Sequence, residues 1–227
     1  MQSLRSFAFN TVMWGSGAVL SLWCALIGRY AHDGIVRGAR RWARTSLWAL
    51  RVFCGITLDT QGMERLPEGG CVIVAQHQSA LDILLWLALL PRPAFVFKKE
   101  LRRIPIFGAL LEPSGMIPVN RGGGRKALLD MVEGARQAVA AGRQVVIFPE
   151  GTRVAHGVRG ELRHGIAALA QGVEAPMLPA STDSGLRWGP RAFRKHPGPV
   201  HVVLHPPVAK ALTREELLTL LGKLYYG

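Results

Sequence analysis

The sequence has little cysteine, and the few cysteines are not arranged for cross-linking or for metal binding. Cys24, Cys54 and Cys71 are odd in number, far apart and set among apolar neighbours. This arrangement fits reduced thiols better than a disulfide framework, and there is no CxxC pair to indicate a zinc site. Five histidines also lack the spacing of a metal site: His156, His164, His196, His201 and His205. We therefore expect no metal centre and interpret these histidines as surface or supporting residues.

The sequence is also short of acidic residues. Asp and Glu number 15 against 28 Lys and Arg, which gives a formal charge of +13 and an attraction to anionic partners. Nucleic acid and an anionic membrane surface are the two partner classes that fit. The cations are dispersed and no recognised nucleic-acid-binding motif occurs, so a nucleic-acid-binding protein held at the membrane is the weaker interpretation. The 49% hydrophobic content suffices for the core of one ordinary domain, alone or with an appendage.

Charge is absent altogether between Phe7 and Ile27. As a helix, this segment has a length of about 30 Å, near the thickness of the hydrocarbon core of a bilayer. Small and polar residues dilute the apolar run, so a helix that spans the membrane and a helix that lies in the interface both stay open. A cleavable signal peptide is disfavoured, because the run is too long and continues into Gly28 and Arg29.

Arginines follow this segment far more often than they precede it. Arg5 and the amino terminus lie before it, and six arginines lie after it: Arg29, Arg37, Arg40, Arg41, Arg44 and Arg51. The bias predicts that the bulk of the protein lies on the cytoplasmic side of a bacterial inner membrane, with these cations near anionic lipids. A solvated helix face is the alternative interpretation of the same arginines.

The rest of the sequence alternates between strand-like and helix-like runs. After a second helix expected over Ile35 to Leu58, this alternation predicts an α/β fold with a mixed, mostly parallel sheet flanked by helices. We expect residues 1–60 to form an N-terminal membrane-binding helical pair and residues 61–227 to form the globular domain. The sequence shows no internal repeat and no low-complexity linker.

The strands and helices expected in this alternation are short. The predicted strands are Cys71 to Ala75, Ala94 to Phe97, Met116 to Val119, Gln144 to Phe148, Ala175 to Ala180 and His201 to His205. The predicted helices are Ser79 to Leu90, Arg125 to Ala141, Gly165 to Gln171 and a last one that begins at Thr213. Gly142 and Gly172 are expected to end two of them in the left-handed conformation. Thr213 and Glu216 have the spacing of a capping box.

The segment QHQSALD at residues 76–82 places a histidine and an aspartate five residues apart, directly before the apolar run ILLWLALL. Ser79 and Asp82 have capping-box spacing, and a helix cap alone accounts for both. It does not account for His77, which lies close enough for its imidazole to fold back toward the Asp82 carboxylate. Asp82 would then fix the tautomer, leaving the other ring nitrogen to take a proton from a substrate hydroxyl. A relay from Ser79 to His77 is the local alternative.

Two further segments carry groups suited to phosphate. FPEGTR at residues 148–153 interrupts an apolar strand, and strand ends in α/β folds are where ligands bind. Gly151 permits close backbone approach, Thr152 offers a hydroxyl and Arg153 offers a planar guanidinium. GMIPVNR ends another strand at Arg121. The alternative interpretation is an ordinary turn with arginines in solvent.

Together with APMLPA, these three segments resemble, in order and spacing, the four motif blocks of the glycerolipid acyltransferases, in particular the 1-acylglycerol-3-phosphate acyltransferases. The resemblance covers residues 62–207 and implies an acyltransferase catalytic domain behind a membrane-binding helical pair. It implies that His77 is the general base and that Asp82 orients it. The block around Pro176 and Pro179 is linked to the side of the acyl donor.

The same resemblance implies a set of residues that bind the acceptor: Lys98, Arg121, Glu150, Gly151, Thr152 and Arg153. Among them, Lys98 and Arg121 correspond to cations that face its phosphate. The sequence departs from the family pattern at Gln76, where Asn or Lys is common, and at Asn120, where Asp is frequent. Neither departure removes a group that the reaction needs.

The reaction implied by the resemblance is acyl transfer to a lipid alcohol. A fatty acyl group would pass from acyl-CoA or acyl-carrier protein to the sn-2 hydroxyl of lysophosphatidic acid, which gives phosphatidic acid for phospholipid biosynthesis. This chemistry needs a base, an oxyanion donor and cations for the phosphate, so we expect no metal or redox cofactor. Since no serine or cysteine needs to be acylated, we expect direct attack in a ternary complex. A different lysolipid acceptor and a non-catalytic lipid-binding protein of the same fold are the alternatives.

Overall fold

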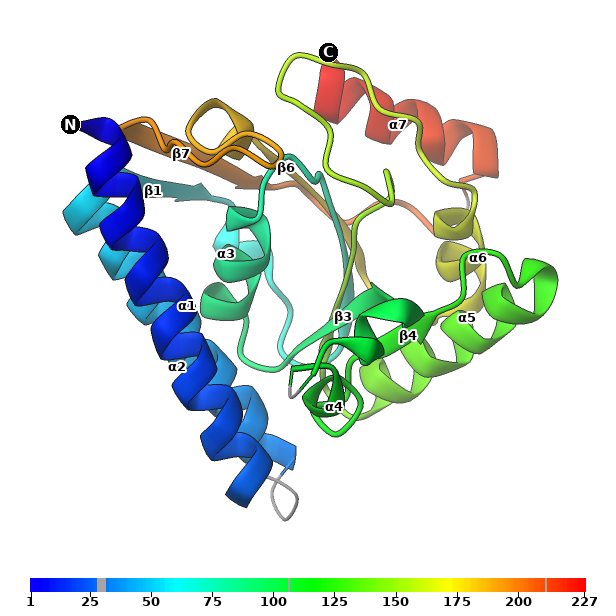
Figure 1. Ribbon diagram of the computed structural model, residues 1–227. Helices are drawn as coiled ribbons and strands as arrows, with labels where there is room; N and C mark the ends of the chain where they lie inside the picture. The colour runs from blue at the N-terminus through cyan, green and yellow to red at the C-terminus, as the bar shows by residue number, and fades with distance from the viewer. Residues whose placement is uncertain (28–31, 106, 211) are drawn as a thin grey trace.

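The computed structural model describes residues 1–27, 32–105, 107–210 and 212–227. Within these residues, seven strands form a sheet with the order β1-β7-β6-β2-β5-β3-β4 (Figure 1). The strands are β1 (Ile56–Gln61), β2 (Cys71–Ala75), β3 (Pro93–Lys98), β4 (Ile117–Val119), β5 (Gln144–Ile147), β6 (Met177–Thr182) and β7 (Gly198–Leu204). Neighbouring strands are parallel except β6 and β7, which are antiparallel. The predicted mixed, mostly parallel sheet is confirmed.

The sheet has an apolar layer on each face, because successive side chains of a strand point to opposite sides. On β2, Cys71, Ile73 and Ala75 contribute to one layer, and Val72 and Val74 contribute to the other. All five residues are buried. Burial on both faces explains why this strand is a continuous apolar run rather than an alternating one.

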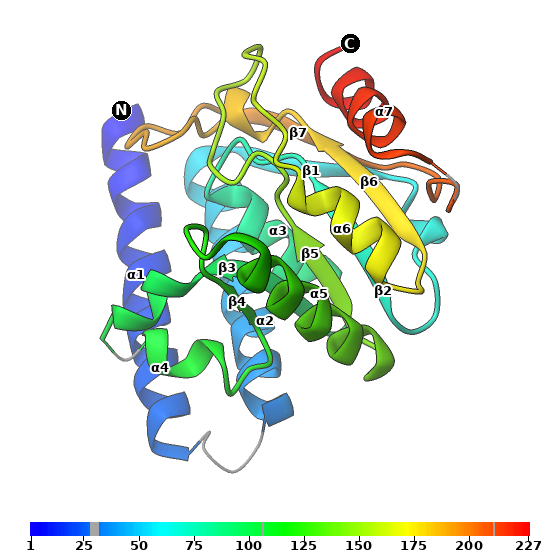
Figure 2. The same cartoon turned by 90° about the vertical axis from the view of Figure 1, so that its right-hand side faces the viewer.

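Different helices cover the two faces (Figure 2). The first layer is completed by α1 (Gln2–Ile27), α2 (His32–Ala49) and α3 (Leu81–Leu89). The second is completed by α5 (Gly124–Ala140), α6 (Gly165–Gly172) and α7 (Arg214–Tyr226). A short helix, α4 (Phe107–Leu111), lies between β3 and β4 in the chain. The sheet is thus enclosed between helices, and its strand ends are left for loops.

The two N-terminal helices lie side by side in both views (Figures 1 and 2). The indole nitrogen of Trp42 on α2 donates a hydrogen bond to the carbonyl oxygen of Met13 on α1 at 2.9 Å. Gly17 leaves room for this contact, since a Cβ there would lie 3.0 Å from the Trp42 indole nitrogen. The expected N-terminal helical pair is therefore present.

The outer side of α1 exposes large apolar side chains. They are Leu4, Phe7, Trp14, Val19, Leu22, Trp23 and Leu26. An exposed apolar surface of this kind marks a site of interaction with another protein or with a membrane. In the part of the chain that the structure describes, no helix combines the length and the apolar character that crossing a membrane requires.

The second predicted helix ends earlier than expected. The prediction of helix over Ile35 to Leu58 is wrong from Gly55 onward, because α2 and a short π-helical turn, Leu50–Cys54, end there and β1 begins at Ile56. Gly55 has a φ of +67°, a left-handed conformation that stops a helix and that glycine adopts without strain. The expected division between residues 60 and 61 falls inside β1, which pairs with β7. That division stays a prediction.

The other helix boundaries agree with the sequence to within two residues, with one correction. Gly142 follows α5 with a φ of +72°, as predicted. Gly172 does not, because α6 continues through it and Val173 caps the helix in an extended conformation. At α7, Thr213 and Glu216 form the predicted capping box. The three cysteines are buried free thiols, which agrees with the expected reduced state.

Candidate active site

The predicted site residues gather at one edge of the sheet, at the C-terminal ends of the adjacent parallel strands β2, β5, β3 and β4. His77 follows β2, the segment 149–153 follows β5, Lys98 is the last residue of β3, and Arg121 lies two residues after β4. Strand ends of this kind are where α/β folds bind ligands. The parallel topology thus brings together motifs that are far apart in the sequence.

The backbone of His77 is fixed on both sides by the loop that follows β5. Its N–H group donates to Oε1 of Glu150 at 3.2 Å, and its carbonyl oxygen accepts from the N–H group of Val154 at 2.8 Å. The first and third motifs are therefore joined by direct hydrogen bonds. The position of the imidazole depends on both loops.

The imidazole of His77 folds back onto the carboxylate of Asp82, as the sequence predicted. Nδ1 of His77 lies 2.9 Å from Oδ2 of Asp82. An ionised carboxylate can only accept hydrogen bonds, so Nδ1 carries the hydrogen and donates it. In the neutral ring, Nε2 then keeps its lone pair and can accept a proton.

The carboxylate of Asp82 is held by four hydrogen bonds and is 1% exposed. Besides Nδ1 of His77, Oδ2 accepts from the N–H groups of Gln78 and Ser79, both at 2.8 Å. Oδ1 accepts from the hydroxyl group of Ser184 at 2.5 Å. Ser79 itself uses its hydroxyl oxygen to accept from the N–H group of Leu81, the first residue of α3, although the N-cap position of this helix is Ala80 rather than the predicted Ser79. Both carboxylate oxygens are therefore anchored at the start of α3.

An aromatic ring supports the imidazole from one side. The rings of His77 and Phe148 are stacked, with centroids 3.9 Å apart and an interplanar angle of 17°. Phe148 in turn stacks on Phe95 at 6.3 Å. The imidazole of His77 is thus confined between a carboxylate at its edge and an apolar ring on its face.

Glu150 is a buried carboxyl group that links His77 to the C-terminal helix. Its Oε1 accepts from the N–H group of His77 and from the hydroxyl group of Tyr226 at 3.3 Å. Its Oε2 is buried and has no hydrogen-bond partner among the described residues. Burial raises the pKa of Glu150 to about 7, and hydrogen bonds from backbone N–H groups and from Tyr226 oppose this rise. These contacts place Glu150 against the backbone of His77, and its role in binding the acceptor stays a prediction.

The second and third motifs meet at Gly151. A Cβ at Gly151 would lie 3.7 Å from Cζ of Arg121 and 3.7 Å from Cγ of Arg163. Those are ordinary van der Waals distances, but Gly151 also has a φ of +68°, a backbone conformation in which any other side chain would be strained. The turn therefore exposes backbone beside the guanidinium group of Arg121, an arrangement suited to a phosphate group.

The three remaining predicted residues lie at the same edge with less contact. Thr152 and Arg153 are exposed in the loop after β5. Lys98 pairs in register with Val119, and its ammonium nitrogen lies 3.6 Å from Oε1 of Glu100. The structure thus brings Arg121 against Gly151, while Lys98 is engaged by a carboxylate of the following turn.

Four residues at the site carried no role in the sequence analysis: Phe148, Arg163, Ser184 and Tyr226. Phe148 lies inside the FPEGTR motif, so its aromatic character was a signal that could have been used. Ser184 and Tyr226 reach the site from 102 and 76 residues away in the chain. No local pattern predicts contacts of that separation.

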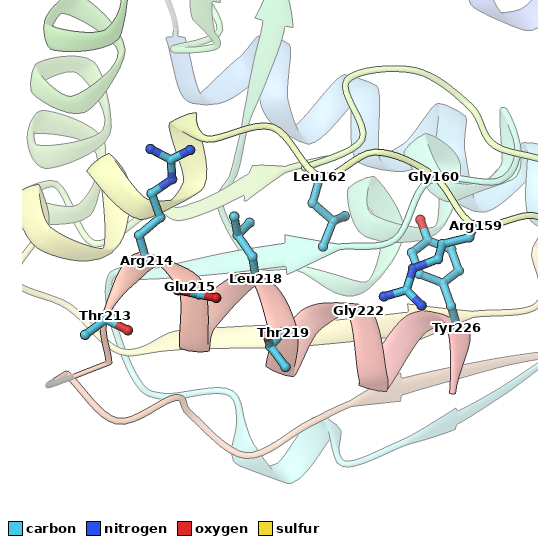
Figure 3. A pocket seen from close by; sticks show the side chains of 10 residues that line it. All are labelled: Arg159, Gly160, Leu162, Thr213, Arg214, Glu215, Leu218, Thr219, Gly222 and Tyr226. Carbon is cyan, nitrogen blue, oxygen red and sulfur yellow. The ribbon is translucent and has the colours of Figure 1, made fainter.

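Two cavities lie near these residues. A groove of about 790 Å³ runs along α7, with Arg214 and Thr213 at one end and Arg159, Gly160 and Tyr226 at the other (Figure 3). A second cavity, of about 440 Å³, is lined by Gln76 and Gln78, which flank His77 in the sequence. Tyr226 lines both the groove and the second cavity, and the second cavity also borders the loop that carries His77.

Comparison with known proteins identifies the family. A sequence model of the family described as Acyltransferase matches residues 57–183, more than half of the chain. The chain belongs to the acyltransferase family. The matched region contains the H-x₄-D segment, GMIPVNR and FPEGTR.

Individual relatives agree with this assignment. The chain is 34% identical to a 1-acyl-sn-glycerol-3-phosphate acyltransferase of Pseudomonas aeruginosa, over 91% of this chain and 81% of that protein. It is 32% identical to a chloroplastic 1-acyl-sn-glycerol-3-phosphate acyltransferase of Brassica napus, over 71% of this chain and 48% of that longer protein.

A solved structure has the same fold. The 1-acyl-sn-glycerophosphate acyltransferase PlsC from Thermotoga maritima superimposes with a TM-score of 0.76 at 21% identity, covering 100% of this chain and 95% of that one. The acyltransferase fold thus includes the N-terminal helical pair as well as the sheet.

Proposed function

We propose that this acyltransferase transfers a fatty acyl group from acyl-CoA or acyl-carrier protein to the sn-2 hydroxyl of 1-acyl-sn-glycerol 3-phosphate, which yields phosphatidic acid. The observation that carries the proposal is the 2.9 Å contact between His77 and Asp82 at the sheet edge where Arg121 lies against Gly151. The His77 imidazole, oriented by Asp82, can activate an alcohol, and the Arg121 guanidinium group can hold a phosphate. The names of the relatives from Pseudomonas aeruginosa and Brassica napus support the same acceptor.

In the proposed reaction, Nε2 of His77 takes the proton of the acceptor hydroxyl while its oxygen attacks the thioester carbonyl carbon. A C–O bond forms, and the carbonyl electrons move onto oxygen to give a tetrahedral oxyanion. When the carbonyl reforms, the C–S bond breaks, and the sulfur leaving group takes the proton from the imidazolium. Asp82 stabilises the imidazolium between these two steps, through the hydrogen bond at Nδ1. The proton therefore passes from alcohol to thiol, and the enzyme forms no covalent intermediate.

Arg121 is the residue that we assign to the acceptor phosphate. Its guanidinium group lies beside Gly151, where the backbone turns with a left-handed φ and no side chain blocks approach. The exposed neighbours Thr152 and Arg153 supply a hydroxyl and a second guanidinium at the same loop. Lys98 contributes a further positive charge at the end of the adjacent strand β3. A phosphomonoester is the headgroup that this concentration of cations suits.

We assign attachment to anionic membrane lipids to the N-terminal helical pair. The exposed apolar residues of α1 can enter the interface, and arginines of α2 such as Arg41 and Arg44 can contact anionic headgroups. The catalytic domain then works at the cytoplasmic face of a bacterial inner membrane, where a lysolipid acceptor resides. This arrangement lets an amphiphilic acceptor reach His77 without leaving the lipid phase.

A lipid-product assay of the purified full chain tests the proposal. The protein is offered lysophosphatidic acid and three lysolipids with larger headgroups, those of choline, ethanolamine and glycerol, in mixed micelles. Each acceptor is tested with palmitoyl-CoA and with palmitoyl-acyl-carrier protein, and products are identified by mass spectrometry. A mock purification from the same host controls for contaminating acyltransferases.

We expect phosphatidic acid as the main product, with turnover from lysophosphatidic acid well above that from the three other lysolipids. Preferential acylation of a headgroup without a phosphomonoester would contradict the assigned acceptor. Product formation with one donor alone would decide between acyl-CoA and acyl-carrier protein.

A further inference from the structure

A serine that follows β6, the strand next to β2 in the sheet, reaches the carboxylate of Asp82. Ser184 is fully buried, and its hydroxyl group donates to Oδ1 of Asp82 at 2.5 Å. This is the bond on the oxygen that does not contact His77. Without it, Oδ1 would be a buried carboxylate oxygen that has lost its donor, which is costly enough to move the side chain.

The segment that carries Ser184 folds back on itself through Trp188. The N–H group of Trp188 donates to the carbonyl oxygen of Ser184 at 2.9 Å, and its indole N–H donates to the carbonyl oxygen of Ala192 at 3.0 Å. Trp188 is buried. The position of Ser184 therefore depends on where the Trp188 ring is held.

The Trp188 ring is held by a buried lysine. Lys195 is 2% exposed, and its ammonium nitrogen lies 4.5 Å from the centre of the Trp188 ring and 5.2 Å from that of Phe9. Both are cation–π distances. The rings of Phe9 and Trp188 also meet edge to face, with centroids 5.4 Å apart. Phe9 belongs to α1, so the contacts among Phe9, Trp188 and Lys195 join the N-terminal helix to the segment that carries Ser184.

Direct hydrogen bonds complete the same junction. The ammonium group of Lys195 donates to Oδ1 of Asn10 at 2.7 Å, and the backbone N–H group of Lys195 donates to the hydroxyl oxygen of Ser6 at 3.0 Å. Burial lowers the pKa of Lys195 to about 8, so the group is still mostly protonated near neutral pH. Figure 1 shows the N-terminal end of α1 beside the loops that lead into β7.

The two faces of α1 thus have different partners. Ser6, Phe9, Asn10 and Met13 have the spacing of one helix face, and that face is turned toward the catalytic domain. Phe7, together with the other exposed apolar residues of α1, lies on the outer side. One helix therefore contacts both the exterior and the chain of groups that ends at Asp82.

We propose that Ser184 and Lys195 are positioning residues, and that through them the inner face of α1 holds the carboxylate of Asp82, and hence the imidazole of His77, in the reactive arrangement. The inference rests on the proposed function, because it assigns His77 the role of base. It extends the role of α1 from attachment to catalysis. A chain of contacts alone does not show coupling, so the test measures the coupling itself.

The experiment is a double-mutant cycle in the full-length protein, on the variants Ser184→Ala, Lys195→Met and both together. The matched control for the lysine is Arg194→Met, which removes the same charge from the exposed neighbouring residue. The control for the serine is Ser181→Ala. The hydroxyl group of Ser181 lies 2.9 Å from Nε2 of His205 and takes no part in the contacts that lead from α1 to Asp82. The kcat, the KM for lysophosphatidic acid, the fraction bound to anionic vesicles and the Tm are measured for each.

We expect Ser184→Ala to lower kcat by about 5- to 100-fold, the loss typical of a buried group left without its partner. Lys195→Met should lower kcat by about 3- to 30-fold while KM and vesicle binding stay at the wild-type values. Because Lys195 acts through Ser184, adding Lys195→Met to Ser184→Ala should cost less than about twofold more. Both controls should keep wild-type kcat.

If kcat of the double variant falls by the product of the two single-variant factors, the inference is overturned. A folded Lys195→Met protein with unchanged kcat would also overturn it. A loss of kcat that merely follows a loss of vesicle binding would also overturn it. If Lys195→Met does not fold, Asn10→Ala, which removes an acceptor of the ammonium group, takes its place in the cycle with the same expected outcomes. A wild-type protein that forms no phosphatidic acid would instead refute the proposed function itself.

Discussion

The imidazole of His77 lies almost parallel to the ring of Phe148, with 3.9 Å between the ring centroids. This stacking limits rotation of the imidazole about the axis that the Asp82 contact leaves free. Replacing Phe148 by leucine keeps the site apolar but removes the flat surface. We expect kcat to fall by about tenfold with little change in the KM for the acceptor, because a base that samples wrong orientations reacts less often. Steady-state kinetics of the variant would measure this.

Phe95→Leu is the control for that prediction. The ring centroids of Phe95 and Phe148 lie 6.3 Å apart, so Phe95 supports the imidazole only through the ring of Phe148. The kcat of Phe95→Leu should fall less than that of Phe148→Leu. Equal losses in the two variants would mean that general packing, and not the stacked ring, matters at this position.

The guanidinium group of Arg121 leads to a prediction about acceptor affinity. Arg121→Ala should raise the KM for lysophosphatidic acid by about 10- to 100-fold with a smaller change in kcat, as expected for a charge-assisted hydrogen bond made in both ground and transition states. Arg153→Ala should act in the same direction. Arg136→Ala, which removes an exposed arginine of α5, should leave KM unchanged. An unchanged KM in Arg121→Ala would exclude this residue as the phosphate ligand.

The buried carboxyl group of Glu150 predicts a pH dependence of stability. Burial raises its pKa from 4.5 to about 7, so the folded protein keeps a proton that the unfolded chain has already lost. The free energy of unfolding should therefore fall as pH rises from about 4.5 to 7, by up to about 3 kcal/mol from this group. Glu150→Gln has no such group and should lose that part of the pH dependence.

Urea denaturation at four pH values between 5 and 8 would measure this difference between wild type and Glu150→Gln. Glu133→Gln, a change at an exposed position on α5, serves as the control and should keep the wild-type slope. A constant difference between wild type and Glu150→Gln across this range would show that Glu150 does not titrate as described.

The exposed side of α1 predicts where the protein meets lipid. Leu22 on α1 is 53% exposed, and Leu129 on α5 is 58% exposed, so the same change can be made on two helices at similar exposure. Leu22→Ser should weaken binding to anionic vesicles by about tenfold, the effect of removing one leucine side chain from an apolar phase. Leu129→Ser should not. Sedimentation with vesicles would compare the two, and equal binding would remove α1 from the lipid contact.

The fold could largely be predicted from the sequence because its strands are short apolar runs and its helices are longer segments with recognisable start and stop residues. Cys71–Ala75 is a buried β-branched run, and the strand was predicted with its exact bounds. β1 was missed because Ile56–Gln61 has one buried residue and lies at the edge of the sheet, where a strand resembles a continued helix or a loop. Gly55, which ends the preceding helical segment with a left-handed φ, was a stop signal of the same kind as Gly142 that the sequence analysis did not use.

The candidate site could be predicted where the motif residues contact one another, and not where the partners come from elsewhere in the chain. The contact between His77 and Asp82 follows from their separation of five residues and from the start of α3 between them. The hydrogen bonds of Ser184 to Asp82 and of Tyr226 to Glu150 depend on how β6 and α7 pack against the sheet. Spacing in the sequence carries no information about such contacts. For Glu150, the motif predicted a place at the site, and its hydrogen bonds put it against the backbone of His77.

The turnover of the His77→Ala variant tests the central claim most directly. The measurement is the rate of phosphatidic acid formation from lysophosphatidic acid and acyl-CoA by variant protein with a wild-type circular dichroism spectrum. Loss of the base should reduce kcat by about 100- to 10,000-fold while the enzyme still binds the acceptor. A folded His77→Ala protein that retains most of the wild-type turnover would contradict the account.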